Sequence, residues 1–74
     1  MTAEQFANEF VNDLLEDLQN PKFDLSKKFF VFYDNVYVDD PNLQILKTKL
    51  NEINFDIVLD NVKDNDKFWK VFKI

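Results

Sequence analysis

The chain has 74 residues, a formal net charge of −5 and no cysteine, which predicts one small domain over residues 1–74 without disulfides or cysteine-based metal sites. Its stability must come from apolar packing, and a hydrophobic content of 46% with nine phenylalanines supplies the material. Because glycine is absent, Asn, Asp or Pro must form the tight turns.

Composition also argues against several classes of function. Without histidine or cysteine, the chain lacks the groups that most often titrate or attack near neutral pH. Without glycine it cannot form a phosphate-cradling loop, and an acidic chain is poorly suited to binding nucleic acid directly. No stretch reaches the roughly 18 apolar residues of a membrane span, and the N-terminus lacks the pattern of a secretion signal. We therefore expect a cytoplasmic, non-enzymatic protein with no cofactor, metal or membrane span.

The first predicted element is a helix over residues 3–19. Thr2 and Gln5 match a capping box at its start. The helix should end before Asn20 and Pro21, because the residue before a proline is pushed out of the helical region. Apolar residues at helical spacing form a broad stripe between these ends. The stripe contains Ala3, Phe6, Ala7, Phe10, Val11, Leu14, Leu15 and Leu18.

A connection over residues 21–27 and a β-hairpin over residues 28–40 are expected next. Aromatic and β-branched residues favour strands here, and Asp34 and Asn35 both tolerate the positive φ of a two-residue turn. The predicted register pairs Tyr33 with Val36, Phe32 with Tyr37, and Val31 with Val38.

The second half of the chain predicts a helix and a second hairpin. Asp40 and Pro41 match an N-cap and first helical position, and the helix should extend to about residue 53. Alternation from Phe55 predicts a strand, residues 61–66 a turn, and residues 67–74 a second strand. A short terminal helix is the alternative, because Phe68 and Phe72 are four residues apart. The order αββαββ predicts an α+β two-layer sandwich with two helices on one face of a four-stranded antiparallel sheet.

One cluster of carboxylates has the side-chain chemistry of a metal site. Asp60, Asp64 and Asp66 lie within seven residues, and hard cations prefer oxygen ligands. Their spacing does not match a calcium loop, so a solvated turn is favoured.

The charge is divided unevenly along the chain. Residues 1–20 carry five carboxylates and no lysine, whereas residues 21–74 carry nine of each and are neutral. Glu9, Asp13 and Glu16 fall opposite the apolar stripe of the predicted helix, with Asp17 at its edge. Like charges three or four residues apart cost about 0.2–0.5 kcal/mol per pair. The acids therefore do not serve helix stability; they serve solubility or bind a partner.

The leading hypothesis from the sequence is a small acidic inhibitor or modulator that binds another protein. Glu9, Asp13, Glu16 and Asp17 would dock on the basic surface of a nucleic-acid-handling protein, as a nucleic-acid mimic whose carboxylates stand where phosphates bind. Nine asparagines, and lysine as the sole cationic residue, suggest an AT-rich coding sequence, as in a low-GC bacterium or its phages and plasmids.

The alternative hypothesis is a structural homo-oligomer, such as a homodimer. In the predicted hairpin, Phe30, Phe32 and Tyr37 share a sheet face. Two helices on the other face would leave this one exposed, and exposed apolar patches usually mark interaction sites. The acidic helix would then serve solubility alone.

Overall fold

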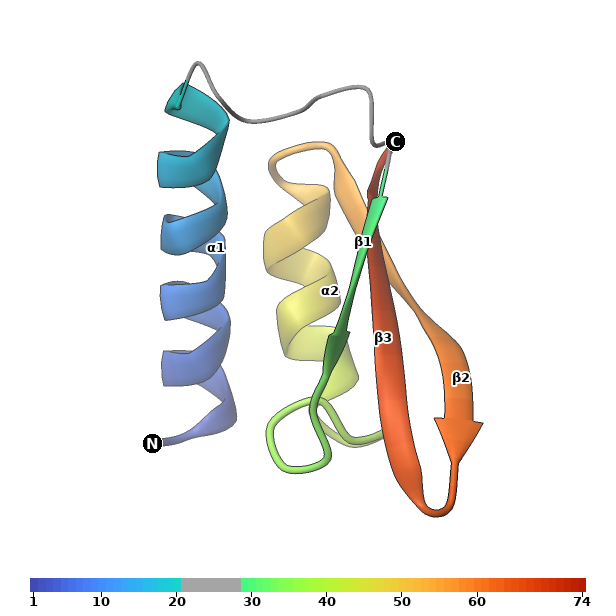
Figure 1. Cartoon of the computed structure of the whole chain (residues 1–74). Coiled ribbons are helices and arrows are strands. Elements are labelled where there is room, and N and C mark those ends of the chain that lie inside the picture. Colours follow the sequence, from blue (N-terminus) through green and yellow to red (C-terminus); the bar gives the residue numbers. More distant parts are fainter. Residues whose placement is uncertain (21–28) are drawn as a thin grey trace.

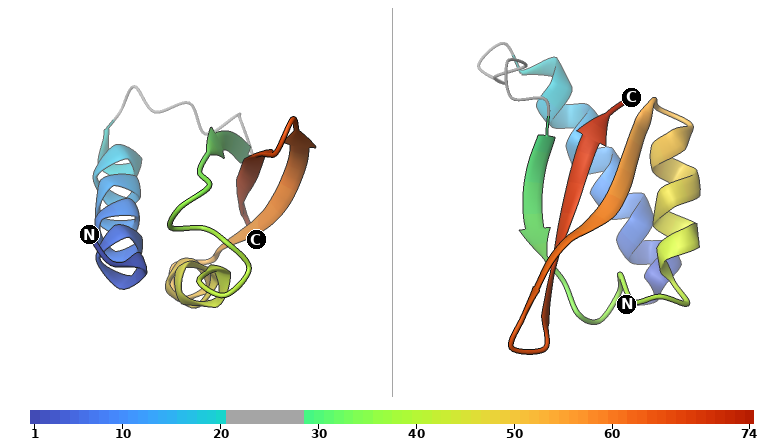
Figure 2. Two further views of the ribbon diagram at one scale, coloured as in Figure 1. Left: turned by 90° about the horizontal axis from the view of Figure 1, so that it is seen from below. Right: turned by 90° about the vertical axis from the view of Figure 1, so that its right-hand side faces the viewer.

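The computed structural model describes residues 1–20 and 29–74. The elements are α1 (Ala3–Gln19), β1 (Phe29–Tyr33), α2 (Leu43–Asn51), β2 (Phe55–Lys63) and β3 (Asp66–Lys73). The strands form an antiparallel sheet in the order β1-β3-β2, and both helices lie on one face of it (Figure 1 and Figure 2). The α+β class is compatible with this arrangement, but the predicted four-stranded sheet is wrong. The predicted connection at residues 21–27 lies outside the described residues.

Helix α1 has the predicted bounds, and its start is a complete capping box. The Oγ1 atom of Thr2 accepts a hydrogen bond from the backbone N of Gln5 at 3.1 Å, and Oε1 of Gln5 accepts one from the backbone N of Thr2 at 2.8 Å. Asn20 is extended, with φ −78° and ψ 122°, as expected for a residue before proline. Ala7 and Leu14 are buried on the inner face of the helix.

The predicted hairpin over residues 28–40 is wrong, because the chain curls after β1 instead of returning as a strand. One carboxylate oxygen of Asp34 accepts hydrogen bonds from the backbone N atoms of Val36, Tyr37 and Val38, at 3.0, 2.7 and 2.8 Å. These three N–H groups are therefore not available to a strand ladder. The Nε1 atom of Trp69 donates to the carbonyl oxygen of Asp34 at 2.9 Å, which fixes the loop to β3.

The second hairpin, β2 and β3, agrees with the prediction, and the terminal segment is a strand rather than a helix. Its turn is tighter than the predicted residues 61–66. Asp64 and Asn65 have φ 53° and 72°, which fits the two positive φ values of a type I′ turn. The register shifts between Leu59 and Asn61, so Asp60 is the extra residue of a bulge.

Helix α2 is shorter than predicted at both ends. It begins at Leu43 because the segment before it forms a turn, in which the side chain of Asp39 accepts a hydrogen bond from the backbone N of Asn42 at 3.0 Å. Asn54, with φ 65°, turns the chain from α2 into β2. Asparagine thus supplies the left-handed conformation that glycine often supplies elsewhere.

The connection from β1 through α2 to β2 is a right-handed crossover, and β3 occupies the position between the two parallel strands (Figure 2). This handedness is the usual one for such a crossover. The core lies between the helices and the sheet, and Trp69 is its largest fully buried side chain. The buried apolar residues are Ala7, Leu14, Val38, Leu46, Leu50, Phe55, Ile57, Trp69 and Val71.

Candidate functional site

The four carboxylates predicted to bind a partner all lie exposed on one flank of α1. With about 100° of rotation per residue, Glu9, Asp13, Glu16 and Asp17 occupy one arc beside the inner face of the helix. We call these four residues the acidic flank. The opposite flank carries one carboxylate, Glu4, and the uncharged amides Asn8, Asn12 and Gln19.

Helix α1 turns its acidic flank toward β1. Phe10, which borders this flank, contacts both helix-facing aromatic rings of β1. The ring centroids are 6.0 Å apart for Phe10 and Phe30, and 4.9 Å apart for Phe10 and Phe32. The acidic flank is therefore next to the edge of the sheet rather than next to α2.

No ion pair neutralises the acidic flank within the described parts of the chain. The ion pairs found there join Lys47 to Asp56, with Nζ 2.6 Å from Oδ1, and Lys67 to Asp40, with the corresponding atoms 3.9 Å apart. Helix α1 itself has no basic residue in its last turn. The charge of the flank is thus presented to solvent.

Two carboxylates of the flank border a shallow groove between α1 and β1. The groove has a volume of about 170 Å³ and is lined by Phe10, Asp13, Leu14, Asp17 and Phe30. We call it the acidic groove. Its apolar residues suit the aliphatic stem of a lysine or arginine, and its carboxylates suit the charged end. Sequence reasoning missed this groove, because Phe30 is far from α1 along the chain.

The residues predicted for an oligomer interface lie on the helix-facing side of the sheet. Phe30, Phe32 and Tyr37 are all half-buried. Phe30 and Phe32 pack against the core, and Tyr37 stacks on Phe6 of α1 with ring centroids 5.1 Å apart. These rings therefore already have partners within the domain.

The other face of the sheet is the exposed one. Phe29, Val31 and Tyr33 of β1 are 51%, 44% and 55% exposed. We call these three residues and the β3 residues paired with them, Phe72, Lys70 and Phe68, the open sheet face. The Nζ atom of Lys70 lies 4.2 Å from the ring centroid of Phe29, and the rings of Tyr33 and Phe68 are 5.7 Å apart. Alternation along β1 predicts these residues on one face, but it does not predict which face the helices cover.

Tyr33 belongs to a polar cluster at the end of the open sheet face. The carboxylate of Asp66 raises the pKa of Tyr33, first through its charge and then through a hydrogen bond at 3.4 Å, and burial adds to the effect. The side-chain amide of Asn35 donates to both the Tyr33 hydroxyl and Asp66 Oδ1, each at 3.2 Å. This cluster anchors the loop after β1 to the β2–β3 turn.

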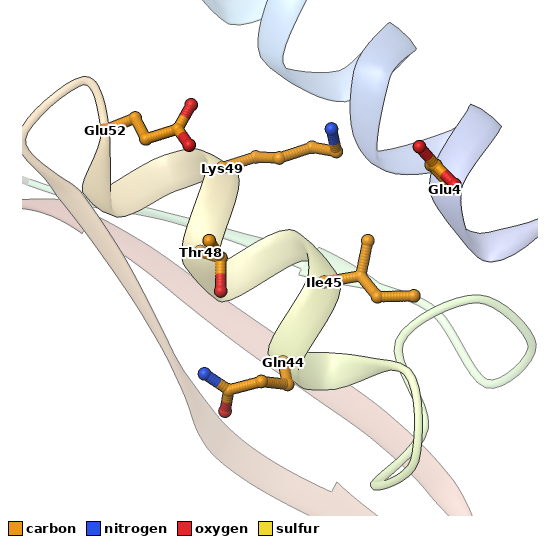
Figure 3. A pocket seen from close by; sticks show the side chains of 6 residues that line it. All are labelled: Glu4, Gln44, Ile45, Thr48, Lys49 and Glu52. Carbon is orange, nitrogen blue, oxygen red and sulfur yellow. The ribbon is translucent and has the colours of Figure 1, made fainter.

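A second groove, of about 370 Å³, lies between α1 and α2. Figure 3 shows Ile45 and Lys49 extending from α2 toward Glu4 on α1. Thr48 is exposed on α2 and also lines this groove.

Within the described residues, the Asp and Glu side chains form no group of three or more that could hold a metal ion. Neither described helix is both long and apolar enough to span a bilayer. Comparison with protein-family models, with curated protein sequences and with solved structures finds no significant match to this chain.

Proposed function

We propose that this protein is a non-enzymatic binding module that docks on a basic surface of another protein through the acidic flank of α1. The observation that carries the proposal is the segregation of charge on one helix. Four of the five carboxylates of α1, namely Glu9, Asp13, Glu16 and Asp17, share the flank beside β1, whereas the opposite flank carries a single carboxylate, Glu4. A surface that served solubility alone would not need this segregation.

The energetics of the helix support the same proposal. Asp13 has three carboxylate neighbours at a spacing of three or four residues, namely Glu9, Glu16 and Asp17. Each pair costs about 0.2–0.5 kcal/mol, and Asp17 near the helix C-terminus is further opposed by the macrodipole. A cationic partner removes this repulsion on binding, and complementary charge speeds association and selects the partner.

The proposed partner is a nucleic-acid-handling protein, and the proposed role is inhibition or modulation. Its basic surface would meet a row of carboxylates in place of phosphates. Glu9, Asp13 and Asp17 follow one another at about 6 Å along the helix axis, because four residues rise by about 1.5 Å each. Such a row is a regular array of negative charge, which is the feature of nucleic acid that basic grooves recognise without regard to sequence.

A charge-matched pair of variants tests the proposal. The first variant neutralises the flank with Glu9→Gln, Asp13→Asn and Glu16→Gln. The second changes the net charge equally, but elsewhere, with Asn8→Lys, Gln44→Lys and Asn61→Lys at exposed positions. Proteins captured from a bacterial lysate by the unmodified chain should be lost with the first variant and kept with the second.

Competition by DNA tests whether the acidic flank mimics nucleic acid. Duplex DNA should release the captured proteins, because it would occupy the same basic surface. If both variants captured the same proteins as the unmodified chain, the acidic flank would not be the contact. If DNA failed to compete, the flank would bind a basic surface that nucleic acid does not use.

A further inference from the structure

Strand β1 is an edge of the sheet, and the described residues leave its outer side unpaired. It pairs with β3 alone. The backbone N of Asp34 donates to the carbonyl oxygen of Lys67, and hydrogen-bonded pairs alternate along an antiparallel ladder. The backbone groups of Phe30 and Phe32 therefore point to β3, and those of Phe29, Val31 and Tyr33 point to the free edge.

Within the described residues, this edge lacks the usual protection against pairing. Natural edges are blunted by charged residues, prolines or bulges. The five residues of β1, Phe29–Tyr33, contain no charge and no proline, and the β1–β3 register has no shift. A free, regular and aromatic edge is a template for an added strand.

The two sides of the edge differ in chemistry. On the helix side, Phe30 lines the acidic groove together with Asp13 and Asp17. On the opposite side, Val31 and Tyr33 are exposed on the open sheet face. A strand added at this edge would therefore have carboxylates on one side and apolar surface on the other.

We propose that the edge of β1 receives an extended segment of the partner as an added strand, in which lysine or arginine alternates with apolar residues. This inference rests on the proposed function and specifies how the partner is held. Residues opposite Phe30 and Phe32 would point toward α1, because paired residues share a face. Residues between them would extend the open sheet face.

The spacings agree with this pattern. Two residues on the same side of a strand are about 6.6 Å apart, and Asp13 and Asp17 are about 6 Å apart along the helix axis. Two successive cationic residues of the added strand can each meet one carboxylate. Their stems would lie along Phe10 and Phe30 in the acidic groove.

Charge complementarity favours this occupant over a second copy of the chain. The β1 strand of a second copy, Phe29–Tyr33, would bring no cation to the groove. It would also bring a second acidic flank close to the first, and like charges across an interface oppose association. A cationic added strand can pair with the β1 edge, fill the acidic groove and neutralise the acidic flank.

Two lysine–valine peptides of equal composition test the inference. In one the residues alternate, KVKVKVK, and in the other they are in pairs, KKVVKKV. The alternating peptide should slow hydrogen exchange of the Val31 and Tyr33 amides, which point to the free edge. The paired peptide has the same charge but has no two lysines two residues apart, so it cannot place successive lysines on one side of a strand and should not slow them.

Two substitutions at one position separate strand addition from charge attraction. Val31→Pro removes an N–H that β3 does not use, and proline is tolerated at such edge positions. Val31→Thr keeps the N–H and serves as the control. The proline variant should bind the alternating peptide at least about tenfold more weakly, and the threonine variant within about twofold of the unmodified chain.

Several results would overturn the inference while leaving the proposed function standing. One is equal binding of the two peptides, and another is unchanged affinity after Val31→Pro, since either would mean attraction by charge alone. Self-association that protects the Val31 amide without peptide would make a second copy the occupant. If the proline variant did not fold, hydrogen exchange in the unmodified chain would decide. The proposed function fails separately, if the charge-matched variants capture the same proteins.

Discussion

At the scale of single residues, Asp34 decides the path of the chain. Its carboxylate accepts three backbone hydrogen bonds from residues 36–38, and its carbonyl accepts one from Trp69. The curled loop buries Val38 completely in the core. One side chain thus turns a segment of high β-propensity into a loop, so that this segment does not pair with β1 as a strand.

Replacing Asp34 tests this role. Asp34→Ala should lower the free energy of unfolding by about 1–3 kcal/mol, because two of the three N–H groups are partly buried and would lose their acceptor. Asp34→Asn keeps one acceptor oxygen and should cost less. Urea denaturation of both variants measures the difference, and an unchanged free energy of unfolding in Asp34→Ala would show that the carboxylate is not the organising group.

Asp56 predicts a dependence of stability on pH. A 2.6 Å hydrogen bond from Lys47 lowers the pKa of Asp56, a hydrogen bond from the Ile57 N–H lowers it further, and burial partly opposes them. Because the folded pKa lies below the unfolded value of about 3.9, the stabilisation is present above that pH. It is lost as the pH falls through the folded pKa.

The measurement compares the unmodified chain with Asp56→Asn at several pH values. Since both side chains are partly exposed, the variant should be less stable by at most about 1 kcal/mol at pH 7. The difference should shrink as the pH approaches 2. A constant difference across this range would mean that the ion pair contributes through packing rather than charge.

At the scale of elements, α1 combines a packing face with a charged flank that opposes folding. Asp13→Lys would convert three repulsive neighbours, Glu9, Glu16 and Asp17, into attractive ones. We expect a gain in unfolding free energy of about 0.5–1 kcal/mol at low ionic strength, which salt should reduce.

The same substitution should weaken binding to a cationic partner. A gain in stability together with a loss of binding would indicate that these carboxylates are retained for binding rather than for stability. Asp13→Asn is the control, with about half of each effect. If Asp13→Lys lowered stability, the repulsion within the flank would not be a real cost.

The elements that follow local rules could be predicted from the sequence. Helix α1 is defined by a capping box and a proline, and β2 and β3 by alternation around an Asp-Asn turn. The pairing of β1 could not be predicted, because it depends on contacts of Asp34 and Trp69 that are 35 residues apart. The exposure of the four carboxylates of α1 could be predicted from helical spacing alone. The groove beside Phe30 could not, because it joins α1 to a strand that is distant along the chain.

At the scale of the whole molecule, the topology brings the features of the proposed interface to one side. The right-handed crossover puts β3 in the centre and β1 at an edge (Figure 2). The acidic flank of α1 lies next to that edge, and the net charge of −5 equals the five carboxylates of residues 1–20. Among the described residues, the fold thus combines negative charge, an apolar groove and an edge strand without a second partner in one surface.

The most direct test of this account is an NMR titration of the ¹⁵N-labelled chain with a lysine-rich peptide. Binding at the acidic flank and the β1 edge should change shifts only in residues 9–17 and 29–33, and these changes should be lost in about 1 M salt, where the Debye length is about 3 Å. Asp60 and Asp64, exposed near the β2–β3 turn, are internal controls and should not respond. Equal changes at these two residues would show unspecific attraction to carboxylates and would contradict the account.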